Sequence, residues 1–521
     1  DTKVPPTRQK RTTVAPTAYV IRNGAGYDIT VVLKPRSEIE AYGDEILKEA
    51  LILEAHRKFA KASESLRSLQ SELFNEAEFD LVLEPEIEDT GDAPIEVPAH
   101  TRQRGGRKAL PAELPRIEVI YDLSDDEKVC DQGHALKQIS EKTSEQLDII
   151  PMKVQVIRHI RKQYACPCCE GVLKLASKPK QPIEKSQASS GLLAYIAVSK
   201  YADSLPLYRQ NAILSRSGID INRSTLANWM TKCGELIQPL INCFEEQVLS
   251  QSFIHMDETP VQVLNEKGKP AESKSYMWVR HAGPPGQRIT LFDYDPSRSG
   301  AVPRRLLAGF TGALMLDGYE GYAPVCKEQG LTRLGCWVHA RRKFVDVSKA
   351  SKKRNSQATY AIKLIAKLYA IEKTSKDSSA EDRYQIRIEN AKPVIDKLRQ
   401  WLDETKPKVP PKSLLGKALQ YLDNQWPRLI AYLEDGQYPI DNNRVENAIR
   451  HFAIGRKNWL FSASVNGAKA SANLYSLIET AKANDLEPYA YLKRVFTELP
   501  NAQSYDDVEK LLPSRVKDVA A

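Results

Sequence analysis

Three carboxylates stand at positions where metal-dependent chemistry would place them. Asp257 follows the apolar run "FIHM", Asp317 follows the apolar run "ALML", and Glu446 is the only acid between positions 442 and 478. The cations around that last acid are Arg444, Arg450, Arg456, Lys457 and Lys469. Carboxylates with open coordination positions suit Mg²⁺ or Mn²⁺, and two such ions about 3.5–4 Å apart can serve phosphoryl transfer. The pattern predicts a site in which the acids hold metal and the cations position a phosphate backbone.

Each acid also has a purely structural explanation. An isolated Asp at the end of a strand is most often a turn or cap residue, and Glu446 could form an ion pair with Arg450 one helical turn later. Glu258, directly after Asp257, would point to the opposite face of the strand and is a weaker candidate for a ligand. The case for chemistry therefore depends on whether the chain brings the three acids together.

The segments that would position the first two acids have the pattern of a mixed sheet. Short apolar strands occur in "SFIHMDET", "SYMWVRHA" and "RITLFDYD", followed by a helix in "AVPRRLLAG" and strands in "GALMLDGYEGY" and "TRLGCWVH". Three antiparallel strands, a helix and two further strands are the order of a ribonuclease-H-like fold, in which the first and fourth strands are neighbours. Asp257 would end the first strand and Asp317 the fourth, so both would reach one metal.

The third acid is predicted to lie on a helix. Asp441 would cap this helix, and Val445, Ile449 and Phe452 form an apolar face at helical spacing. Between the last strand and this helix, residues 340–438 are rich in Lys, Leu, Ala and Ile at helical spacing. That pattern indicates an all-helical insertion.

The segment "CWVHARRKF" opens the insertion. Its cations Arg341, Arg342 and Lys343 could bind phosphate. Cys336 and His339 could be zinc ligands, but two such residues alone favour buried packing.

Four of the eight cysteines crowd into one short stretch, which points to a metal rather than to a disulfide framework. Cys166 and Cys169 have the C-x-x-C spacing of a zinc knuckle, which directs both thiolates at one tetrahedral ion. Cys130 and His134 are the candidates that would complete a structural Zn²⁺ site with three cysteines and one histidine. Cys168 could replace Cys169, and buried free cysteines are the alternative.

Two segments before the first strand have the pattern of a helix-turn-helix. The first helix is predicted over residues 207–215, Gly218 supplies the turn, and Ser224 would cap the second helix. The apolar stripe of the second helix consists of Leu226, Trp229, Met230 and Cys233. The polar side chains that could reach bases or phosphates are Arg209, Arg223, Thr225, Asn228 and Lys232. Ordinary helical hairpins share this pattern, so the pattern alone does not establish DNA binding.

The composition describes a globular, multidomain protein. The chain has 521 residues, 42% of them apolar, and a formal net charge of +8; its local basic runs suit a polyanionic partner. No segment approaches about 18 consecutive apolar residues, and the N-terminus lacks the layout of a signal peptide, which predicts a cytoplasmic protein without a membrane partner. Residues 76–96 hold nine acids and no Lys or Arg, which indicates a linker. The stretch "AYVIRNGAGYDITVVL" could form a hairpin.

The order of motifs from about residue 60 to about residue 500 closely resembles the large transposase subunit of the insertion-sequence-66 family. The matching stretches include "YACPCCEG", "RSTLANWM", "DETPVQVL", "LDGYEGY", "CWVHARRKF", "NNRVENAIR" and "GRKNWLFS". Many long motifs in the right order make the resemblance highly specific. Position 133 is Gly where the family usually has a second Cys, so the fourth zinc ligand departs from the family pattern, and the first 37 residues do not match the family's usual start.

The resemblance implies a Mg²⁺-dependent DDE transposase that cuts the ends of a mobile element to free 3′-hydroxyl groups and joins them to target DNA. Asp257, Asp317 and Glu446 correspond to the family's acidic triad. A zinc module, a helix-turn-helix, two small accessory proteins of the same element and a dimer or larger assembly on double-stranded DNA in the bacterial nucleoid are further implications. The alternatives are a catalytically inactive or regulatory DNA-binding protein of the same fold and a structure-selective nuclease.

The predicted fold is α+β and multidomain, with a ribonuclease-H-like mixed sheet as the catalytic core. The predicted segments, in chain order, are an N-terminal segment of unassigned role (1–37), a helical segment that could dimerise (38–75), an acidic linker (76–100), a zinc-binding module (101–180), the helix-turn-helix (181–250), the first part of the core (251–339), the helical insertion (340–438), the second part of the core (439–485) and a helical tail (486–521).

Overall fold

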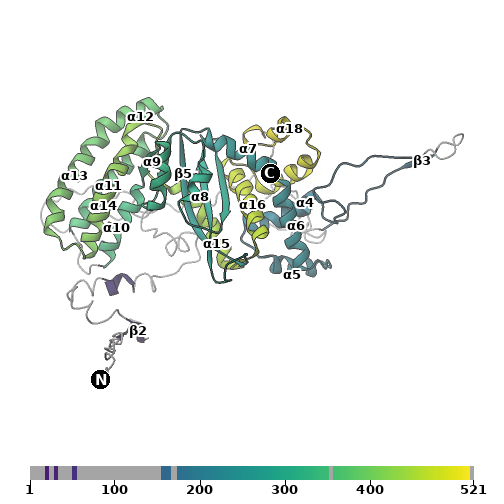
Figure 1. Ribbon diagram of the computed structural model, residues 1–521, viewed down its shortest axis with the longest axis horizontal. Helices are drawn as coiled ribbons and strands as arrows, with labels where there is room; N and C mark the ends of the chain where they lie inside the picture. The colour runs from purple at the N-terminus through teal and green to yellow at the C-terminus, as the bar shows by residue number, and fades with distance from the viewer. Residues whose placement is uncertain are drawn as a thin grey trace, which may run out of the picture. The chain divides into compact units, whose positions relative to one another are not determined.

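The computed structural model (Figure 1) describes residues 18–22, 28–32, 50–54, 154–165, 173–350 and 356–516. The chain divides into two units, Asp1–Val82 with Arg161–Ala521 and Leu83–Ile160. The predicted acidic linker and the predicted zinc ligands lie outside the described residues; the ligands are Cys130, His134, Cys166, Cys169 and the alternative Cys168.

The predicted hairpin near the N-terminus is confirmed. Strand β1 (Ala18–Arg22) pairs antiparallel with β2 (Asp28–Val32), and Val20 lies opposite Thr30. Strands β3 (Gln163–Ala165) and β4 (Leu173–Leu175) pair antiparallel and form a second short two-stranded ribbon. In the sequence, β3 and β4 precede and follow the segment that carries Cys166, Cys168 and Cys169.

A mixed sheet forms the centre of the large unit, with the strand order β7-β6-β5-β8-β9. The strands in this order are β5 (Phe253–Asn265), β6 (Lys274–Ala282), β7 (Ile289–Asp295), β8 (Ala313–Leu316) and β9 (Thr332–Gly335). A sixth strand, β10 (Ser462–Ser464), pairs parallel with β5 and places Ser462 opposite Val263. The first three are antiparallel, whereas β8 runs parallel to β5 and β9 runs parallel to β8. The prediction that the first and fourth strands of this region are neighbours is therefore confirmed. All four residues of β8 are buried, as expected for a strand covered on both faces.

Strand β5 continues well beyond the position predicted for its end. It runs through Asp257 to Asn265, because Val261 and Val263 alternate into the core and β6 pairs with it as far as Gln262. On its other edge, the ladder with β8 stops at His255. Asp257 is thus an interior residue of β5 that lies just beyond the point where β8 ends.

Helices before and after the sheet share one hydrophobic core with it. They are α4 (Ser190–Tyr201), α5 (Leu207–Arg216), α6 (Arg223–Leu236), α7 (Gln238–Leu249), α15 (Asn443–Trp459), α16 (Val465–Ala483) and α17 (Pro488–Glu498). Two short helices, α8 (Ala301–Leu306) and α9 (Ala323–Gln329), connect β7 to β8 and β8 to β9, and α18 (Tyr505–Glu509) follows α17. Within the described segments, no helix has the length and apolar character needed to cross a membrane.

The two helices predicted as a helix-turn-helix are α5 and α6. Gly218 adopts a φ of +77° in the turn between them, and the predicted apolar stripe of α6 is buried. The cap differs from the prediction. Asn222, not Ser224, caps α6: its side chain accepts the Thr225 N–H at 3.1 Å, while the Ser224 hydroxyl donates to the same Asn222 oxygen at 2.5 Å. Asparagine supplies the accepting oxygen one residue before the helix begins.

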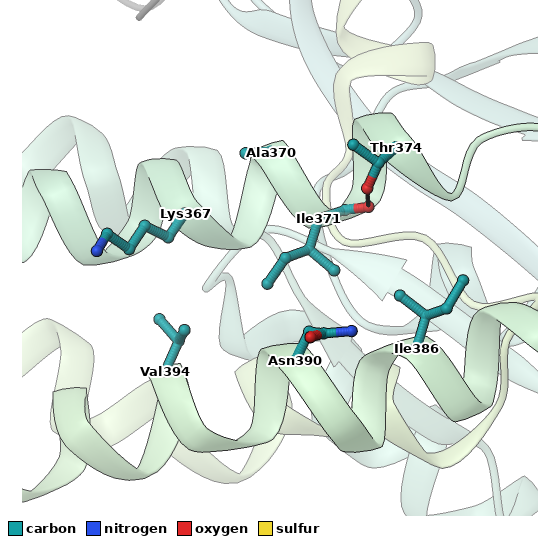
Figure 2. Close-up of a pocket in the computed structure, with 7 residues that line it drawn as sticks. All are labelled: Lys367, Ala370, Ile371, Thr374, Ile386, Asn390 and Val394. Carbon is teal, nitrogen blue, oxygen red and sulfur yellow. Dashed lines mark hydrogen bonds between the residues drawn. The ribbon is translucent and has the colours of Figure 1, made fainter. Parts of the chain in front are cut away.

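The predicted insertion is all helical. Its helices are α10 (Trp337–Ala350), α11 (Ser356–Thr374), α12 (Ala380–Ile386), α13 (Lys392–Thr405) and α14 (Leu414–Ile430), which have a hydrophobic core of their own (Figure 1). A π-helical turn, Arg387–Ala391, joins α12 to α13. A pocket of about 480 Å³ lies between α11 and these two helices, with Lys367, Ile386 and Asn390 on its walls (Figure 2). None of the three predicted catalytic acids lines it.

Helices α6 and α16 approach each other closely at Gly234. A Cβ at this position would lie 2.5 Å from the Cα of Ala470, and the Asn473 side chain donates to the Gly234 carbonyl at 2.9 Å. The missing side chain of Gly234 is therefore what allows the two backbones to meet.

We expect Gly234→Ala to lower the free energy of unfolding by about 1–3 kcal/mol, because the added methyl group forces α6 away from α16. Alanine is intrinsically a better helix former than glycine. A net loss of stability in Gly234→Ala therefore comes from the contact with α16. Denaturant unfolding measures the change. Gly467→Ala, within α16, is the matched control because its Cβ would meet only Ser464 Oγ, at 3.4 Å. Equal effects of the two substitutions would contradict the close approach.

Candidate active site

The sheet brings Asp257 and Asp317 to the same level. The last pair of the parallel ladder between β5 and β8 joins His255 to Met315, and each aspartate lies two residues beyond this pair. Side chains at equivalent positions of neighbouring parallel strands point to the same face. The two half-buried aspartates therefore stand side by side where β8 ends.

Glu446 joins the two aspartates from the first turn of α15. Burial raises the pKa of Asp257 well above its ordinary value, and the carboxylates of Asp317, Glu258 and Glu446 raise it further. Burial also raises the pKa of Glu446; Arg342 and Arg450 oppose this rise, and Asp317 adds to it. Mutual effects of this kind require short distances. The structure thus places the three acids that the sequence singled out near enough to interact electrostatically, although their carboxylate oxygens do not all lie within 4.8 Å of one another.

Backbone amides orient the two aspartates. The Glu258 N–H donates to Asp257 Oδ1 at 2.8 Å, and the Tyr319 N–H donates to Asp317 Oδ1 at 2.8 Å. Each bond occupies one carboxylate oxygen and fixes the direction of the other. Such fixed carboxylates lose little freedom when they bind a cation.

Glu446 is buried next to two groups of α10. Its Oε1 lies 3.5 Å from His339 Nδ1, and its Oε2 lies 3.6 Å from Arg342 Nη2. Burial and the Arg342 guanidinium lower the pKa of His339, so the imidazole is neutral at pH 7. Among the described residues, neither Glu446 Oε1 nor His339 Nδ1 has a hydrogen-bond partner.

An unpartnered carboxylate oxygen in a buried position is costly unless something else binds it. Glu446 is 2% exposed, and the Asp317 carboxylate is near enough to raise its pKa. A hard divalent cation such as Mg²⁺ prefers carboxylate oxygens. The acids present therefore fit such an ion.

Asn442, the residue before α15, ties this helix to the sheet. It is fully buried, its Nδ2 donates to the Met256 carbonyl at 3.2 Å, and its Oδ1 lies 3.0 Å from His255 Nδ1. Because the Met256 carbonyl can only accept, the amide nitrogen must face it and His255 must donate from Nδ1. The Asn442 N–H donates to Cys336 Sγ at 3.3 Å. These bonds hold the first turn of α15 beside Asp257.

The start of α15 differs in detail from the prediction. Asn442, not Asp441, occupies the position before the helix, and its side chain makes no cap bond because it is used for the contacts with β5. Asp441 still serves the helix start, since its Oδ1 accepts the Asn443 N–H at 3.1 Å. The predicted apolar face of the helix, at Val445, Ile449 and Phe452, is buried.

Glu258 connects β5 to the loop that follows Asp317. Its carboxylate accepts the Tyr322 hydroxyl at 2.5 Å and Arg298 Nε at 2.7 Å. The Arg298 guanidinium in turn lies 4.1 Å from the centre of the Tyr319 ring. With both oxygens engaged in this way, Glu258 supports the loop, as its predicted position on the opposite face suggested.

The predicted DNA-contacting residues differ in exposure. Arg209, Arg223, Asn228, Lys232, Lys343, Arg444 and Lys457 are exposed, and Thr225, Arg342, Arg450 and Arg456 are half-buried. Lys232 forms an ion pair with Glu235 at 2.9 Å. Arg456 donates to Thr259 Oγ1 at 3.0 Å and to the Pro260 carbonyl. Arg341 differs from the expectation for a phosphate contact, because it is buried, 5% exposed, on the face of α10 that carries Trp337 and Phe344.

Sequence reasoning missed the roles of Asn442 and Arg298, and it gave His339 no place at this site. Asn442 begins the quoted stretch "NNRVENAIR", but an asparagine before a helix is ordinarily a cap. His339 was weighed only as a zinc ligand or a packed residue. Its proximity to Glu446 could not be read from local spacing.

Comparison with known families places this geometry in context. The family model described as "Transposase IS66 family" matches residues 185–470. The chain belongs to the IS66 transposase family. Three further models match the family's other parts: "zinc-finger binding domain of transposase IS66" at residues 127–170, "Transposase C of IS166 homeodomain" at 46–119 and "IS66 C-terminal element" at 476–514.

Relatives of this IS66-family chain occur in Sinorhizobium fredii (strain NBRC 101917 / NGR234). The uncharacterized protein y4jD is 35% identical over 416 residues, which are 78% of this chain and 81% of the relative. The uncharacterized protein y4qI is 32% identical over 477 residues, 88% of this chain and 83% of the relative. The family assignment thus agrees with the resemblance found in the motifs.

We expect Asn442→Ala to destabilise this IS66-family protein by about 2–4 kcal/mol, because it leaves the Met256 carbonyl and the His255 Nδ1–H buried without partners. Denaturant unfolding measures the loss. Asn443→Ala is the matched control, since within the described residues the Asn443 side chain donates to Asp441, at 2.9 Å, and not to β5. If Asn443→Ala destabilised the protein as much as Asn442→Ala, the contacts with β5 would not be the anchor.

His255 should make the fold sensitive to acid. Burial, with help from Arg444, lowers the pKa of His255 from 6.5 to about 3, and the bond to Asn442 only partly offsets this. Between these two values the unfolded chain binds more protons than the folded protein, so stability from this group is present above about pH 6.5 and is lost as the pH falls toward 3. The limiting slope is about 1.4 kcal/mol per pH unit.

Unfolding measured from pH 7 to pH 4.5 tests this effect. We expect the stability of the wild type to fall more steeply with acidification than that of His255→Gln, which cannot titrate in this range. The carboxylates and His281 are common to both proteins. Because His255 also lowers the pKa of His281, the difference between the two curves reports His255 together with its effect on His281. Parallel curves would show that His255 does not take up a proton on unfolding.

Proposed function

We propose that this chain is a DDE transposase that cleaves the ends of a mobile element to free 3′-hydroxyl groups and joins these to target DNA by metal-dependent phosphoryl transfer. The observation that carries the proposal is the meeting of Asp257, Asp317 and Glu446. Burial raises the pKa of Asp257, and the carboxylates of Asp317, Glu258 and Glu446 raise it further. Like charges are expensive to collect in a partly dry site unless they serve to bind a cation.

The sheet order supports a ribonuclease-H-like core. Three antiparallel strands are followed by two parallel ones, with β5 central and β8 beside it. Asp257 and Asp317 lie on these two neighbours, and Glu446 comes from a helix that packs across β5 and β6. This arrangement supports the assignment of the two aspartates and the glutamate as the acidic triad.

The three acids share one part in the proposed reaction. They would hold Mg²⁺ or Mn²⁺, and such an ion, when bound, would activate the attacking oxygen and stabilise the leaving oxygen of the phosphodiester. The Glu258 and Tyr319 amides keep the aspartates aimed at the shared site. Arg342, close to Glu446 Oε2, offsets the charge of this carboxylate and offers a cation to a nearby phosphate.

Double-stranded DNA is the proposed partner. The exposed cations Arg444 and Lys457 lie on the same helix as Glu446. A DNA phosphate backbone that reaches the acids would therefore also lie near these positive side chains. Arg223 and Asn228 are exposed at the start of α6, the end of a recognition helix that meets bases. The zinc-finger and homeodomain models over residues 127–170 and 46–119 support further DNA contacts and a structural Zn²⁺. A dimer on DNA and two small accessory proteins complete the proposal.

Two other functions give different results in one assay. A regulatory DNA-binding protein of this fold would bind element ends without cutting them. A structure-selective nuclease would cut branched or single-stranded DNA irrespective of the element-end sequence. The presence of all three acids at one place favours the transposase over the inactive protein.

We expect Asp257→Asn to reduce Mg²⁺-dependent nicking and strand joining of element-end DNA by roughly a thousandfold, about 4 kcal/mol of lost transition-state stabilisation. Asparagine keeps an oxygen for the Glu258 N–H but removes the charge that binds the metal. Binding of element-end DNA, followed by gel shift, should persist. Wild-type rates of joining in this variant would show that the triad is wrongly assigned.

Glu320→Gln is the matched control for the loss of a carboxylate. Glu320 is exposed, three residues after Asp317, and pairs with Arg428 at 2.7 Å on the surface. Its substitution should leave nicking near the wild-type rate. A wild-type protein that binds element ends but never nicks them would instead favour the regulatory protein.

A further inference from the structure

A second set of donor atoms meets at Glu446, and it comes from residues other than the two aspartates. Cys336 precedes α10, His339 lies in its first turn, and Glu446 lies in the first turn of α15. One sulfur, one imidazole nitrogen and one carboxylate oxygen of these residues all lie within 4.8 Å of one another. No other group of three or more such residues is as close among the residues that the structure describes.

The spacing of the first two residues explains why they converge. Side chains three positions apart lie on one face at the start of a helix, so Cys336 and His339 point the same way. Two residues alone are weak grounds for a metal, but Glu446 adds a third donor from a different element. The Asn442 N–H, which donates to Cys336 Sγ at 3.3 Å, holds the two elements together at this point.

Two buried polar atoms at this site lack partners. His339 Nδ1 and Glu446 Oε1 are 3.5 Å apart, yet neither makes a hydrogen bond within the described part of the chain. With Zn–N and Zn–S bonds near 2.0 and 2.3 Å, a tetrahedral ion separates its ligand atoms by roughly 3.4 Å. The nitrogen and the oxygen therefore already stand at the separation that such an ion needs. Cys336 Sγ lies within 4.8 Å of one nitrogen of His339 and one carboxylate oxygen of Glu446, so it would have to move by at most about an ångström.

The donor set selects a class of metal that differs from the one proposed for catalysis. Mg²⁺ takes oxygen ligands and has little affinity for sulfur, whereas Zn²⁺ and similar ions take thiolate, imidazole and carboxylate in one shell. Three protein ligands leave a fourth position for water. The two aspartates prefer a hard ion such as Mg²⁺, whereas Cys336 and His339 prefer a softer ion such as Zn²⁺. Glu446 could serve as a ligand in either set.

We propose that Cys336, His339 and Glu446 form a binding site for a thiophilic divalent cation such as Zn²⁺, and that its occupation inhibits the enzyme by withdrawing Glu446 from the catalytic metal. The thiol releases its proton to solvent as the sulfur binds, and the nearby Asn442 N–H stabilises the resulting thiolate. The inhibitory half rests on the proposed transposase function, whereas the binding half does not.

Cobalt(II) is the probe for the binding half, because a thiolate bound to Co²⁺ gives an absorption band that an oxygen-only site lacks. The full-length protein is titrated with Co²⁺ alongside Cys336→Ser and His339→Gln. We expect each variant to bind the ion at this site roughly a hundredfold more weakly, since even outer-shell changes cost 10–100-fold. The thiolate band of the site should be absent from Cys336→Ser.

Controls separate this site from other thiols. Cys326→Ser removes a buried cysteine that lies elsewhere, in α9, and should leave the Co²⁺ titration unchanged. Any metal at the predicted zinc module, at Cys130, His134, Cys166 and Cys169, contributes equally to all variants and cancels in the difference. His339 is half-buried, so His339→Gln provides a tolerant second variant if Cys336→Ser folds poorly. Identical titrations of the wild type, Cys336→Ser and His339→Gln would overturn the proposal.

Zinc inhibition tests the second half. In saturating Mg²⁺, micromolar Zn²⁺ should slow element-end nicking by the wild type at least tenfold relative to its own zinc-free rate, and Cys336→Ser should need far more Zn²⁺ for the same loss. A cobalt site without zinc inhibition would overturn the withdrawal of Glu446 but leave the binding site intact. If no protein nicks DNA at all, the proposed function fails, and the cobalt titration still decides whether the site exists.

Discussion

The candidate site depends on one buried side chain, Asn442. Its amide bonds to β5 at His255 and Met256, 187 and 186 residues earlier in the chain, and its backbone bonds to Cys336, 106 residues earlier. No other residue type of this size both donates and accepts from one planar group in the required directions. Because it is buried, each of these bonds is expensive to break. The registration of α15 against the sheet, and with it the position of Glu446, follows from this anchor.

Electrostatics explains why such an anchor is needed. Burial and neighbouring carboxylates raise the pKa of Asp257, so the three acids resist being brought together. Packing must therefore supply the free energy that overcomes the repulsion between the three carboxylates. The apolar face of α15 and the Asn442 bonds hold Glu446 in place, while Arg342 and Arg450 offset its charge. A cation bound among the acids would relieve the repulsion between their charges. The site is therefore better suited to hold a metal ion than to remain without a compensating positive charge.

Sequence reasoning succeeded where the signal is local. The apolar runs predicted the strands, and their order predicted that β5 and β8 are neighbours; the periodicity of residues 340–438 predicted helices; and the lone acid at position 446 drew attention to α15. It failed where a partner is distant. The continuation of β5 past Asp257 depends on pairing with β6, and the approach of Cys336 and His339 to Glu446 depends on a fold that joins segments about a hundred residues apart. The cap of α6 is a local exception, because Asn222 and Ser224 are both polar and only the position of the first helical residue decides between them. Periodicity identifies faces of elements, but only the packed core decides which faces meet.

The same reasoning explains how a large helical insertion can interrupt the site without disturbing it. The insertion leaves β9 and returns to α15 at nearly one point, because the Trp337 N–H donates to the Ile440 carbonyl at 3.2 Å and the Trp337 indole donates to the Leu429 carbonyl at 2.8 Å. With its two ends joined, the length of the inserted chain adds only a logarithmic entropic cost, and its own core stabilises the rest. The first turn of the insertion is then as much a part of the site as the strands are, since α10 delivers His339 and Arg342 to Glu446. An insertion closed at its base can thus contribute residues to the site while the remainder of its surface is free to take on other contacts.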